Sequence, residues 1–424
     1  MRSRPDVWWS AATFFPGFAI VTVVAFADGG YFSETWAWTT LALVSLALIV
    51  LLLRGKIVLG RFDLAGLAAL AGFIGWVGLS ASWSPTPDDS LQEAQRGLIY
   101  VAALLAFVLL VEREEIRDHL TGVAAAVSLV AAYGLGERLM GKQPTATDPI
   151  QGTRLIEPLG YANALGILVV LSLLLSLGLA LHAGSHRGRA LWLAPIIVLL
   201  PAFAWTESRG GSFALVVGLL VLAVAERRTI ATLLPGSRGL HATIGTGLAV
   251  VVVCVVVIAA FRTDRPLGPR VDYWSVAWSQ WEANTWLGAG AGTFAQYWQR
   301  EDAPVAVRDA HSLYLETLAE LGPVGLLLLL VALTIPILAA LSARDAPLTG
   351  VSASAYSAYL VHAGLDWDWE MPAVTLAGLL CAVGLLAAAR QKPHAITIGR
   401  GGRRVFAVAT LAIAGLALAG SLVD

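Results

Sequence analysis

The sequence predicts an all-α integral membrane protein, a polytopic bundle of about 12 to 14 transmembrane helices. Of its 424 residues 57% are hydrophobic and only 13% are charged, whereas a soluble domain carries roughly a quarter charged residues. The mean hydropathy is +0.73. Apolar stretches recur along the whole chain, and basic residues gather on alternate connections between them. These observations indicate that most of the surface faces hydrocarbon.

Thirteen apolar stretches can be placed against a hydrocarbon core of about 30 Å, which a helix crosses at about 1.5 Å per residue. Some are short, and no sheet is expected because an open strand edge is not tolerated in lipid. The first is expected to be an anchor and not a cleaved signal peptide, since further spans follow it at once. In chain order they lie near residues 11–27, 36–53, 64–81, 98–111, 119–136, 159–181, 189–205, 211–225, 241–261, 322–342, 349–365, 371–389 and 405–422.

The basic residues predict the orientation of these spans. With the N-terminus in the cytoplasm, 18 of the 28 lysines and arginines fall on inside segments, as the positive-inside rule requires. The first outside loop, residues 28–34, has none. The ten basic residues predicted outside are Arg96, Arg138, Lys142, Arg154, Arg209, Arg262, Arg265, Arg270, Arg300 and Arg308.

This orientation makes residues 262–310 a long extracytoplasmic loop within a single transmembrane domain spanning residues 1–424. Loops of such length are usually functional. Trp274, Ala277, Trp278 and Trp281 are spaced as one face of a helix, and indole rings favour the headgroup region. We therefore expect short amphipathic helices lying on the membrane surface.

Arg209 stands in a short outside connection, Thr206 to Gly211, where the charge rule does not expect it. Two interpretations are open. The guanidinium could extend to lipid headgroups, which is common for interfacial arginines. Alternatively it binds an anion, since the glycines would let a phosphate approach the start of the next helix.

Arg270 opens the tryptophan-rich helix, and an alternating glycine segment, residues 288–294, follows it. A loop arginine is ordinarily solvated. The glycines could suggest a phosphate-binding loop, but the strand and crossover helix of a nucleotide-binding unit are missing. A flexible hinge is the favoured interpretation of this segment.

His311 and His362 are the two histidines on the predicted outer side. His311 ends the long loop, and an imidazole can accept the proton of a hydroxyl near neutral pH. A hydrogen-bonded interfacial histidine is the simpler alternative. Asp366 and Asp368 could hold a divalent cation, although pairing with the outside arginines or hydration is favoured. Cys254 and Cys381 lie in apolar runs and fit neither a disulfide nor a metal site.

Several of these segments together resemble the O-antigen ligase/polymerase family of bacterial envelope glycan enzymes. The resemblance is specific over about residues 205–330 and looser upstream, at Gly160-Tyr161-Ala162-Asn163-Ala164. Ser312 departs from the asparagine that usually follows the histidine. The matching pieces are Ser208-Arg209-Gly210, the helix from Arg270 to Trp278, Gly290-Ala291-Gly292-Thr293-Phe294, Asp309-Ala310-His311-Ser312-Leu313-Tyr314 and Glu320-Leu321-Gly322.

The resemblance implies a GT-C-like glycosyltransferase of the bacterial cytoplasmic (inner) membrane, with its active site facing the periplasm. It implies an undecaprenyl-diphosphate-linked glycan donor, a lipid or glycan acceptor, and no metal or other cofactor. Arg209 and Arg270 would bind the pyrophosphate, and His311 would activate the acceptor hydroxyl. Membrane lipids are expected partners and nucleic acids are not. Supporting roles would fall to Arg154, Asn163, Tyr314, Glu316, Asp366 and Asp368.

Two further alternatives stay open at this point. A ligase and a polymerase share the donor chemistry and differ in the hydroxyl that attacks. A transporter or flippase of lipid-linked sugars is less favoured, because it should show internal repeats and broken midplane helices with buried charge. The sequence shows no internal repeat, and its predicted functional polar groups cluster at one face.

Overall fold

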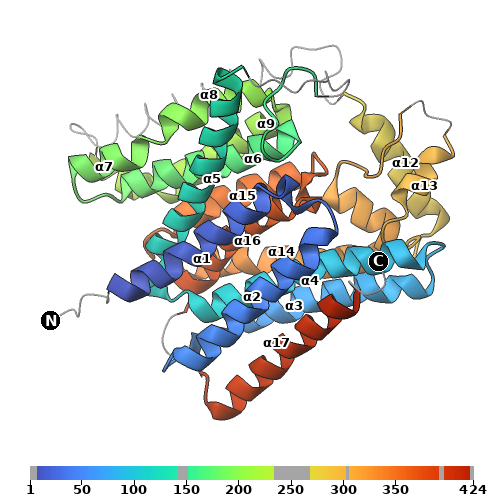
Figure 1. The fold of residues 1–424 in the computed structure, drawn as a ribbon, viewed down its shortest axis with the longest axis horizontal. Helices are drawn as coiled ribbons and strands as arrows, with labels where there is room; N and C mark the ends of the chain where they lie inside the picture. Colours follow the sequence, from blue (N-terminus) through green and yellow to red (C-terminus); the bar gives the residue numbers. More distant parts are fainter. Residues whose placement is uncertain (1–6, 142–150, 234–267, 302–304, 391–395, 421–424) are drawn as a thin grey trace.

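The computed structural model describes residues 7–141, 151–233, 268–301, 305–390 and 396–420, and these form an almost entirely helical bundle (Figure 1). Eight helices of the described chain are long and apolar enough to cross a membrane, and three shorter helices are apolar as well. The predicted all-α, polytopic class is therefore confirmed. The α-helices are α1 (Val7–Ala25), α2 (Glu34–Leu53), α3 (Arg61–Leu79), α4 (Pro87–Leu110), α5 (Ile116–Leu139), α6 (Ala162–Leu181), α7 (His186–Leu193), α8 (Ile196–Thr206), α9 (Arg209–Ala225), α10 (Arg227–Leu233), α12 (Arg270–Ala283), α13 (Phe294–Gln299), α14 (Leu313–Ser342), α15 (Thr349–Ala363), α16 (Pro372–Ala388) and α17 (Arg400–Gly420).

Twelve of the thirteen predicted stretches coincide with these helices, and the stretch near 241–261 lies outside the described residues. The short stretch 98–111 is only the apolar part of α4, whose polar first turns begin at Pro87. The stretch 189–205 is divided into α7 and α8 at Ala194 and Pro195, because proline lacks the N–H that a continuous helix needs.

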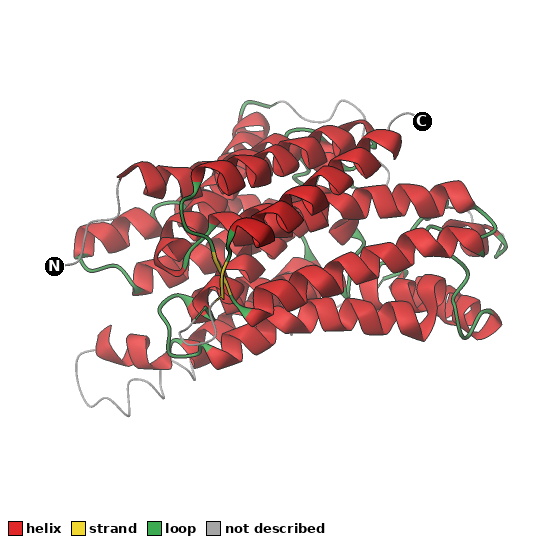
Figure 2. Ribbon diagram, turned by 90° about the horizontal axis from the view of Figure 1, so that it is seen from below, coloured by secondary structure: helices red, strands yellow, loops and turns green. Residues whose placement is uncertain are grey.

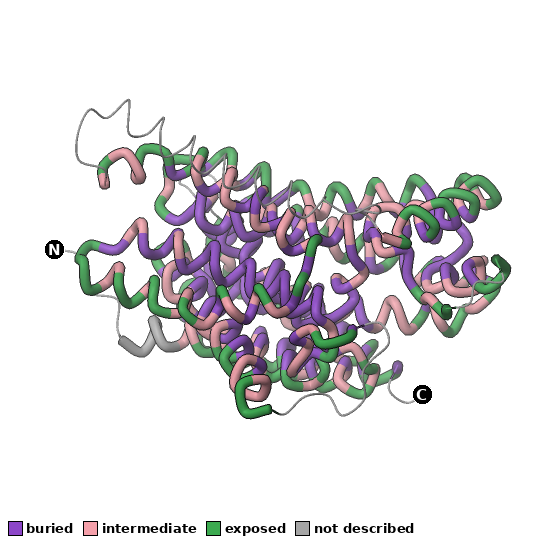
Figure 3. Tube along the Cα trace, turned by 90° about the horizontal axis from the view of Figure 1, so that it is seen from above, coloured by how far each residue is buried: buried purple, intermediate pink, exposed green. Residues whose placement is uncertain are grey.

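The interior of the bundle is formed by α4, α6 and α16, whose residues are mostly buried, while α3 and α17 expose apolar side chains (Figure 3). Small residues let helices approach closely in the centre. A Cβ added to Gly178 in α6 would lie 2.5 Å from Val351 in α15, and one added to Gly378 in α16 would lie 2.5 Å from Tyr359. Exposed apolar faces on the outer helices fit a hydrocarbon surround.

One end of the bundle is closed by two buried ion pairs. Arg390 binds both carboxylate oxygens of Asp63 at 2.8 and 2.9 Å, and Arg54 binds both oxygens of Glu115 at 2.9 and 2.8 Å. Next to them, β1 (Val58–Leu59) pairs antiparallel with β2 (Ile396–Thr397) (Figure 2). The strand pair joins the segment that precedes α17 to the α2–α3 connection.

Helices α12 and α13 pack on the outer part of α14 at the other end (Figure 1). The predicted amphipathic helix is present, but its buried face is shifted by one residue, to Tyr273, Val276, Ala277 and Gln280. Of the expected face, Ala277 is buried, whereas Trp278 is 47% exposed. The tryptophans thus border the contact with α14 and leave indole surface uncovered.

Candidate functional site

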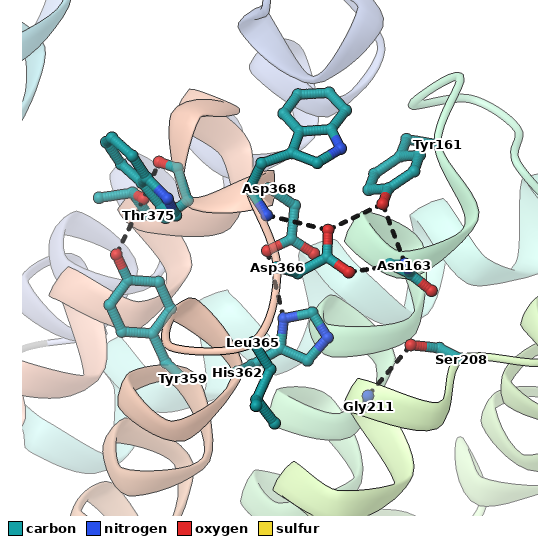
Figure 4. Close-up of polar contacts among 12 residues, drawn as sticks. Tyr161, Asn163, Ser208, Gly211, Tyr359, His362, Leu365, Asp366, Asp368 and Thr375 are labelled. Atoms are coloured by element: carbon teal, nitrogen blue, oxygen red, sulfur yellow. Dashed lines mark hydrogen bonds and ion pairs between the residues drawn. The ribbon is translucent and has the colours of Figure 1, made fainter. Parts of the chain in front are cut away.

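Asp366, in the connection between α15 and α16, is a buried carboxylate that collects donors from three parts of the chain (Figure 4). Its Oδ1 accepts from the Tyr161 hydroxyl at 2.8 Å and from its neighbour Trp367 N at 2.9 Å. Its Oδ2 accepts from Asn163 Nδ2 at 2.7 Å and from Arg270 Nη2 at 2.5 Å. The start of α6, the start of α12 and the α15–α16 connection therefore meet at one side chain.

Arg270 is the first residue of α12 and is held at two points. Its Nε donates to the carbonyl oxygen of Leu365 at 2.5 Å, while Nη2 binds Asp366. Burial opposes the charged guanidinium, yet Asp366 raises the pKa of Arg270 above its ordinary value. Conversely, burial acts to raise the pKa of Asp366, but Arg270, His311 and His362 hold it below its usual range. The pair is thus ionised and fixed in orientation.

His311 adopts a left-handed backbone conformation, with φ 54°, which is strained for a residue with a side chain. Its Nδ1 lies 3.0 Å from the carbonyl oxygen of Asp309. Because a carbonyl can only accept, Nδ1 carries the hydrogen and the lone pair resides on Nε2. The ring packs on Tyr273, with centroids 4.7 Å apart. Burial lowers the pKa of His311 below its usual 6.5, so the imidazole is neutral at neutral pH.

Arg209 is the first residue of α9 and is exposed. Ser208 caps this helix by accepting from Gly211 N at 3.0 Å. The backbone of Gly210 lies against the buried His362 of α15, since a Cβ added there would be 3.1 Å from His362 Nε2. His362 Nδ1 in turn lies 3.2 Å from Asp368 Oδ1. Arg209 is thereby carried on a helix that packs against the last turn of α15, directly before the connection that binds Arg270.

The glycine segment is not the flexible hinge that we expected. Gly288, Gly290 and Gly292 have φ of 71°, 108° and 75°, and the segment is buried against Glu320 of α14. The amides of Gly292 and Phe294 donate to the two Glu320 carboxylate oxygens, both at 2.9 Å. The alternating glycines do surround two acceptor oxygens, but these belong to a glutamate of the same chain.

Three further carboxylates, those of Asp309, Glu316 and Glu370, place an oxygen each within 4.8 Å of one another. They are internally bonded: Glu316 accepts from Ala310 N at 2.7 Å, and Glu370 accepts from Arg96 Nη1 at 2.9 Å. Burial, together with Glu370, raises the pKa of Asp309 well above its usual range. The raised pKa of Asp309 favours a protonated carboxyl group in this cluster.

The remaining predicted residues take structural positions. Arg154 Nε donates to the carbonyl oxygen of Gln151 at 3.0 Å, in the connection that leads into α6. The Tyr314 hydroxyl donates to the carbonyl oxygen of Leu360 at 2.8 Å and fixes α14 to α15. Asp366 pairs with Arg270, as the favoured interpretation of the sequence expected, and Asp368 contacts His362. Asn163, Asp366 and Arg270 are joined directly, and His311 lies in their electrostatic surroundings; Tyr314 and Arg154 bond elsewhere.

Two cavities adjoin this end of the bundle. One, of about 120 Å³, is lined by apolar side chains of α3, α4, α14, α15 and α16 and by Glu93, Arg96, Glu316 and Glu320. The other is a groove of about 750 Å³ between α3, α4 and α17, apolar except near Asp88 and two glutamines of α4. Glu316 therefore faces the first cavity as well as the carboxylate cluster.

Sequence reasoning gave no role to Tyr161, His362, Glu320 or Glu370. Tyr161 and Glu320 stood inside the motifs that carried the family resemblance, so a search for polar residues within those motifs could have found them. His362 was noted only as a histidine on the predicted outer side, and Glu370 only as a neighbour of Asp366 and Asp368 along the chain. Their roles depend on which helices are neighbours, which spacing along the chain does not give.

Comparison with known proteins adds a family assignment for part of the chain. Residues 194–330 match the family model described as O-Antigen ligase, and this segment holds Arg209, Arg270, His311 and Glu320. The resemblance drawn from the motifs is confirmed by this match. No curated protein matches the chain.

Proposed function

Starting from this O-antigen ligase-like segment, we propose that the protein is a membrane glycosyltransferase that moves a glycan from undecaprenyl diphosphate to an acceptor hydroxyl. We place the reaction on the extracytoplasmic face of the bacterial cytoplasmic membrane. The observation that carries the proposal is the Asp366 junction, which fixes Arg270 beside His311. The last turn of α15, which leads into this junction, also lies against the helix bearing Arg209.

The arginines would stabilise the leaving group. As the bond between the anomeric carbon and the diphosphate oxygen breaks, its electron pair passes to the diphosphate, whose negative charge grows. Arg270 is held by Leu365 and Asp366 before any substrate arrives, and donors that need no reorganisation stabilise developing charge most effectively. Asp366 offsets the charge of Arg270, so Arg209 would supply the additional positive charge.

His311 would take the proton of the acceptor. Its neutral ring carries the lone pair on Nε2, because Nδ1–H is directed to the carbonyl oxygen of Asp309. The acceptor oxygen forms the new bond to the anomeric carbon while its proton moves to Nε2. Attack from the face opposite the diphosphate inverts the anomeric centre. The groups named here perform these steps without a metal ion, which is our proposal for this enzyme.

A transfer assay tests the proposal. Purified protein in detergent receives a synthetic polyprenyl-diphosphate glycan and an acceptor, and the product is separated by mass. We expect His311→Gln to lower kcat by roughly 10²- to 10⁴-fold, and Arg270→Gln by roughly 10²- to 10³-fold. Arg228→Gln, at a side chain 80% exposed on α10, is the matched control and should transfer at the wild-type rate.

The same transfer assay identifies the acceptor and distinguishes a polymerase, a ligase and a flippase. Transfer onto a second copy of the same lipid-linked glycan identifies a polymerase, and transfer onto a different lipid identifies a ligase. If His311→Gln and Arg270→Gln transfer as fast as wild type, the roles given to these two residues are wrong, and if the wild type transfers nothing, the enzyme assignment is wrong. Movement of the lipid across vesicle membranes without any transfer would favour a flippase instead.

A further inference from the structure

His362 is a buried histidine to which the mechanism above gives no task. Its side chain is fully buried, and Nδ1 lies 3.2 Å from Asp368 Oδ1. The other ring nitrogen, Nε2, has no hydrogen-bond partner within the described parts of the chain. Buried polar atoms are rarely left in this state. The carboxylate fixes the ring, and the free nitrogen points away from it (Figure 4).

The group that faces Nε2 is the first turn of α9. A Cβ added to Gly210 would lie 3.1 Å from Nε2 and 3.3 Å from Cδ2 of the same ring, so a side chain at this position would press on the ring. The first turn of a helix carries unpaired N–H groups and a partial positive charge, and it favours anions. In α9 the Ser208 hydroxyl accepts from Gly211 N, and Arg209 is the first helical residue.

We propose that His362, oriented by Asp368, is a further ligand of the diphosphate and donates from Nε2 to a phosphate oxygen bound at the α9 N-terminus. This inference rests on the proposed function, which places the same anion beside Arg209. In the bound state Nδ1–H is directed to Asp368 and Nε2–H to the phosphate, so the ring is an imidazolium. The charged groups around it are Asp366, Asp368 and Arg270.

Binding of the anion is then linked to uptake of a proton by His362. Burial and Arg270 oppose the imidazolium, whereas Asp368 and Asp366 favour it, and the phosphate adds a further negative charge. Affinity for a diphosphate should therefore fall as the pH rises and the ring loses its second proton. A histidine with a purely structural role would leave the pH dependence unchanged.

The test is calorimetric binding of inorganic pyrophosphate to the purified full-length protein between about pH 6 and 8, where histidines titrate. Loss of a charge-assisted hydrogen bond should weaken binding roughly tenfold or more near pH 6. We expect this loss in His362→Gln, together with a flatter pH dependence than in wild type. Protonation of the probe itself is common to all variants, so the difference from wild type is the readout.

The matched control is His119→Gln. His119 is also fully buried and also has one ring nitrogen, Nδ1, without a partner among the described residues. Its Nε2, however, lies 2.8 Å from the carbonyl oxygen of Leu380, away from α9. This variant should bind pyrophosphate as wild type does. Equal losses in both variants would show a general effect of removing a buried histidine and would overturn the proposal.

A second variant keeps the test valid if His362→Gln does not fold. Asp368→Asn leaves the ring in place but removes the charge that favours the imidazolium, so pyrophosphate binding should weaken at a lower pH than in wild type. An unchanged pH dependence would overturn the inference. If the wild type transfers glycan while His362→Gln binds pyrophosphate normally, only this inference fails; if the wild type transfers nothing, the proposed function fails first.

Discussion

Replacing Asp366 by asparagine tests the junction on which the site depends. The substitution keeps the shape of the side chain but removes its charge, and one of its two acceptor oxygens becomes an N–H₂ donor. Four donors now meet Asp366, from Tyr161, Asn163, Arg270 and Trp367, at 2.5 to 2.9 Å. An asparagine can satisfy only about half of them, and the Arg270 guanidinium loses its counter-charge.

The magnitude follows from the burial of the two partners. The Asp366 side chain is 0% exposed and the Arg270 side chain 19%. Removing one member of a fully buried ion pair typically costs about 3–5 kcal/mol. Because Arg270 keeps partial contact with solvent, which screens its charge, we expect a loss of about 2–4 kcal/mol in the free energy of unfolding. The KM for the lipid-linked donor should rise as well, since Arg270 is no longer held in place.

The assay is a denaturant titration in mixed micelles, arranged as a double-mutant cycle of Asp366→Asn and Arg270→Gln. A parallel cycle on Arg228 and Asp345, an ion pair at 3.0 Å with 80% and 71% exposed side chains, serves as the control and should show no measurable coupling. A coupling between Asp366 and Arg270 within about 0.5 kcal/mol of zero, with an unchanged donor KM, would refute the reasoning.

Three further outcomes are expected. Because burial lowers the pKa of His311 below 6.5, the transfer rate should stay constant as the pH falls to about 6.5 and should decline only below it. The stability contributed by this group is also lost as the pH falls, since the unfolded state binds the proton first. Gly288→Ala should give little folded protein, because its Cβ would lie 2.2 Å from the Glu320 backbone, whereas Gly75→Ala, with nothing within 4 Å, should express normally in a membrane-fraction blot. Glu320→Gln should lower the unfolding temperature, since one of the two side-chain oxygens that accept from backbone N–H groups is replaced by an N–H₂ donor.

Much of the fold could be predicted because hydrocarbon imposes a simple requirement on each span. Apolar length alone placed twelve of the thirteen predicted stretches on helices. Helix boundaries that lie in polar turns could not be predicted in this way. The first turns of α4, from Pro87 to Gln95, are polar and still helical, so apolar length could not reveal them.

The candidate site was predictable to the extent that its residues stand in motifs. The sequence favoured pairing of Asp366 with one of the outside arginines, but it could not show that this partner would be Arg270, which is 96 residues away along the chain. The glycine segment was misjudged for a related reason. Alternating glycines are compatible with flexibility or with a tight anion-binding turn, and only the contact with Glu320 decides between them.

The hydrogen bonds between Glu320 and the glycine segment have a consequence for how the long polar segment responds to proteolysis. Helix α12 is tied to the bundle through Arg270 and Asp366, and the glycine segment is tied separately through Glu320. Between these two attachments lies Trp286, whose side chain is 80% exposed. A chymotryptic nick there would leave both fragments bound through their own anchors. The segment would be severed covalently and still keep its shape, so it behaves as part of the body of the protein and not as a detachable lid.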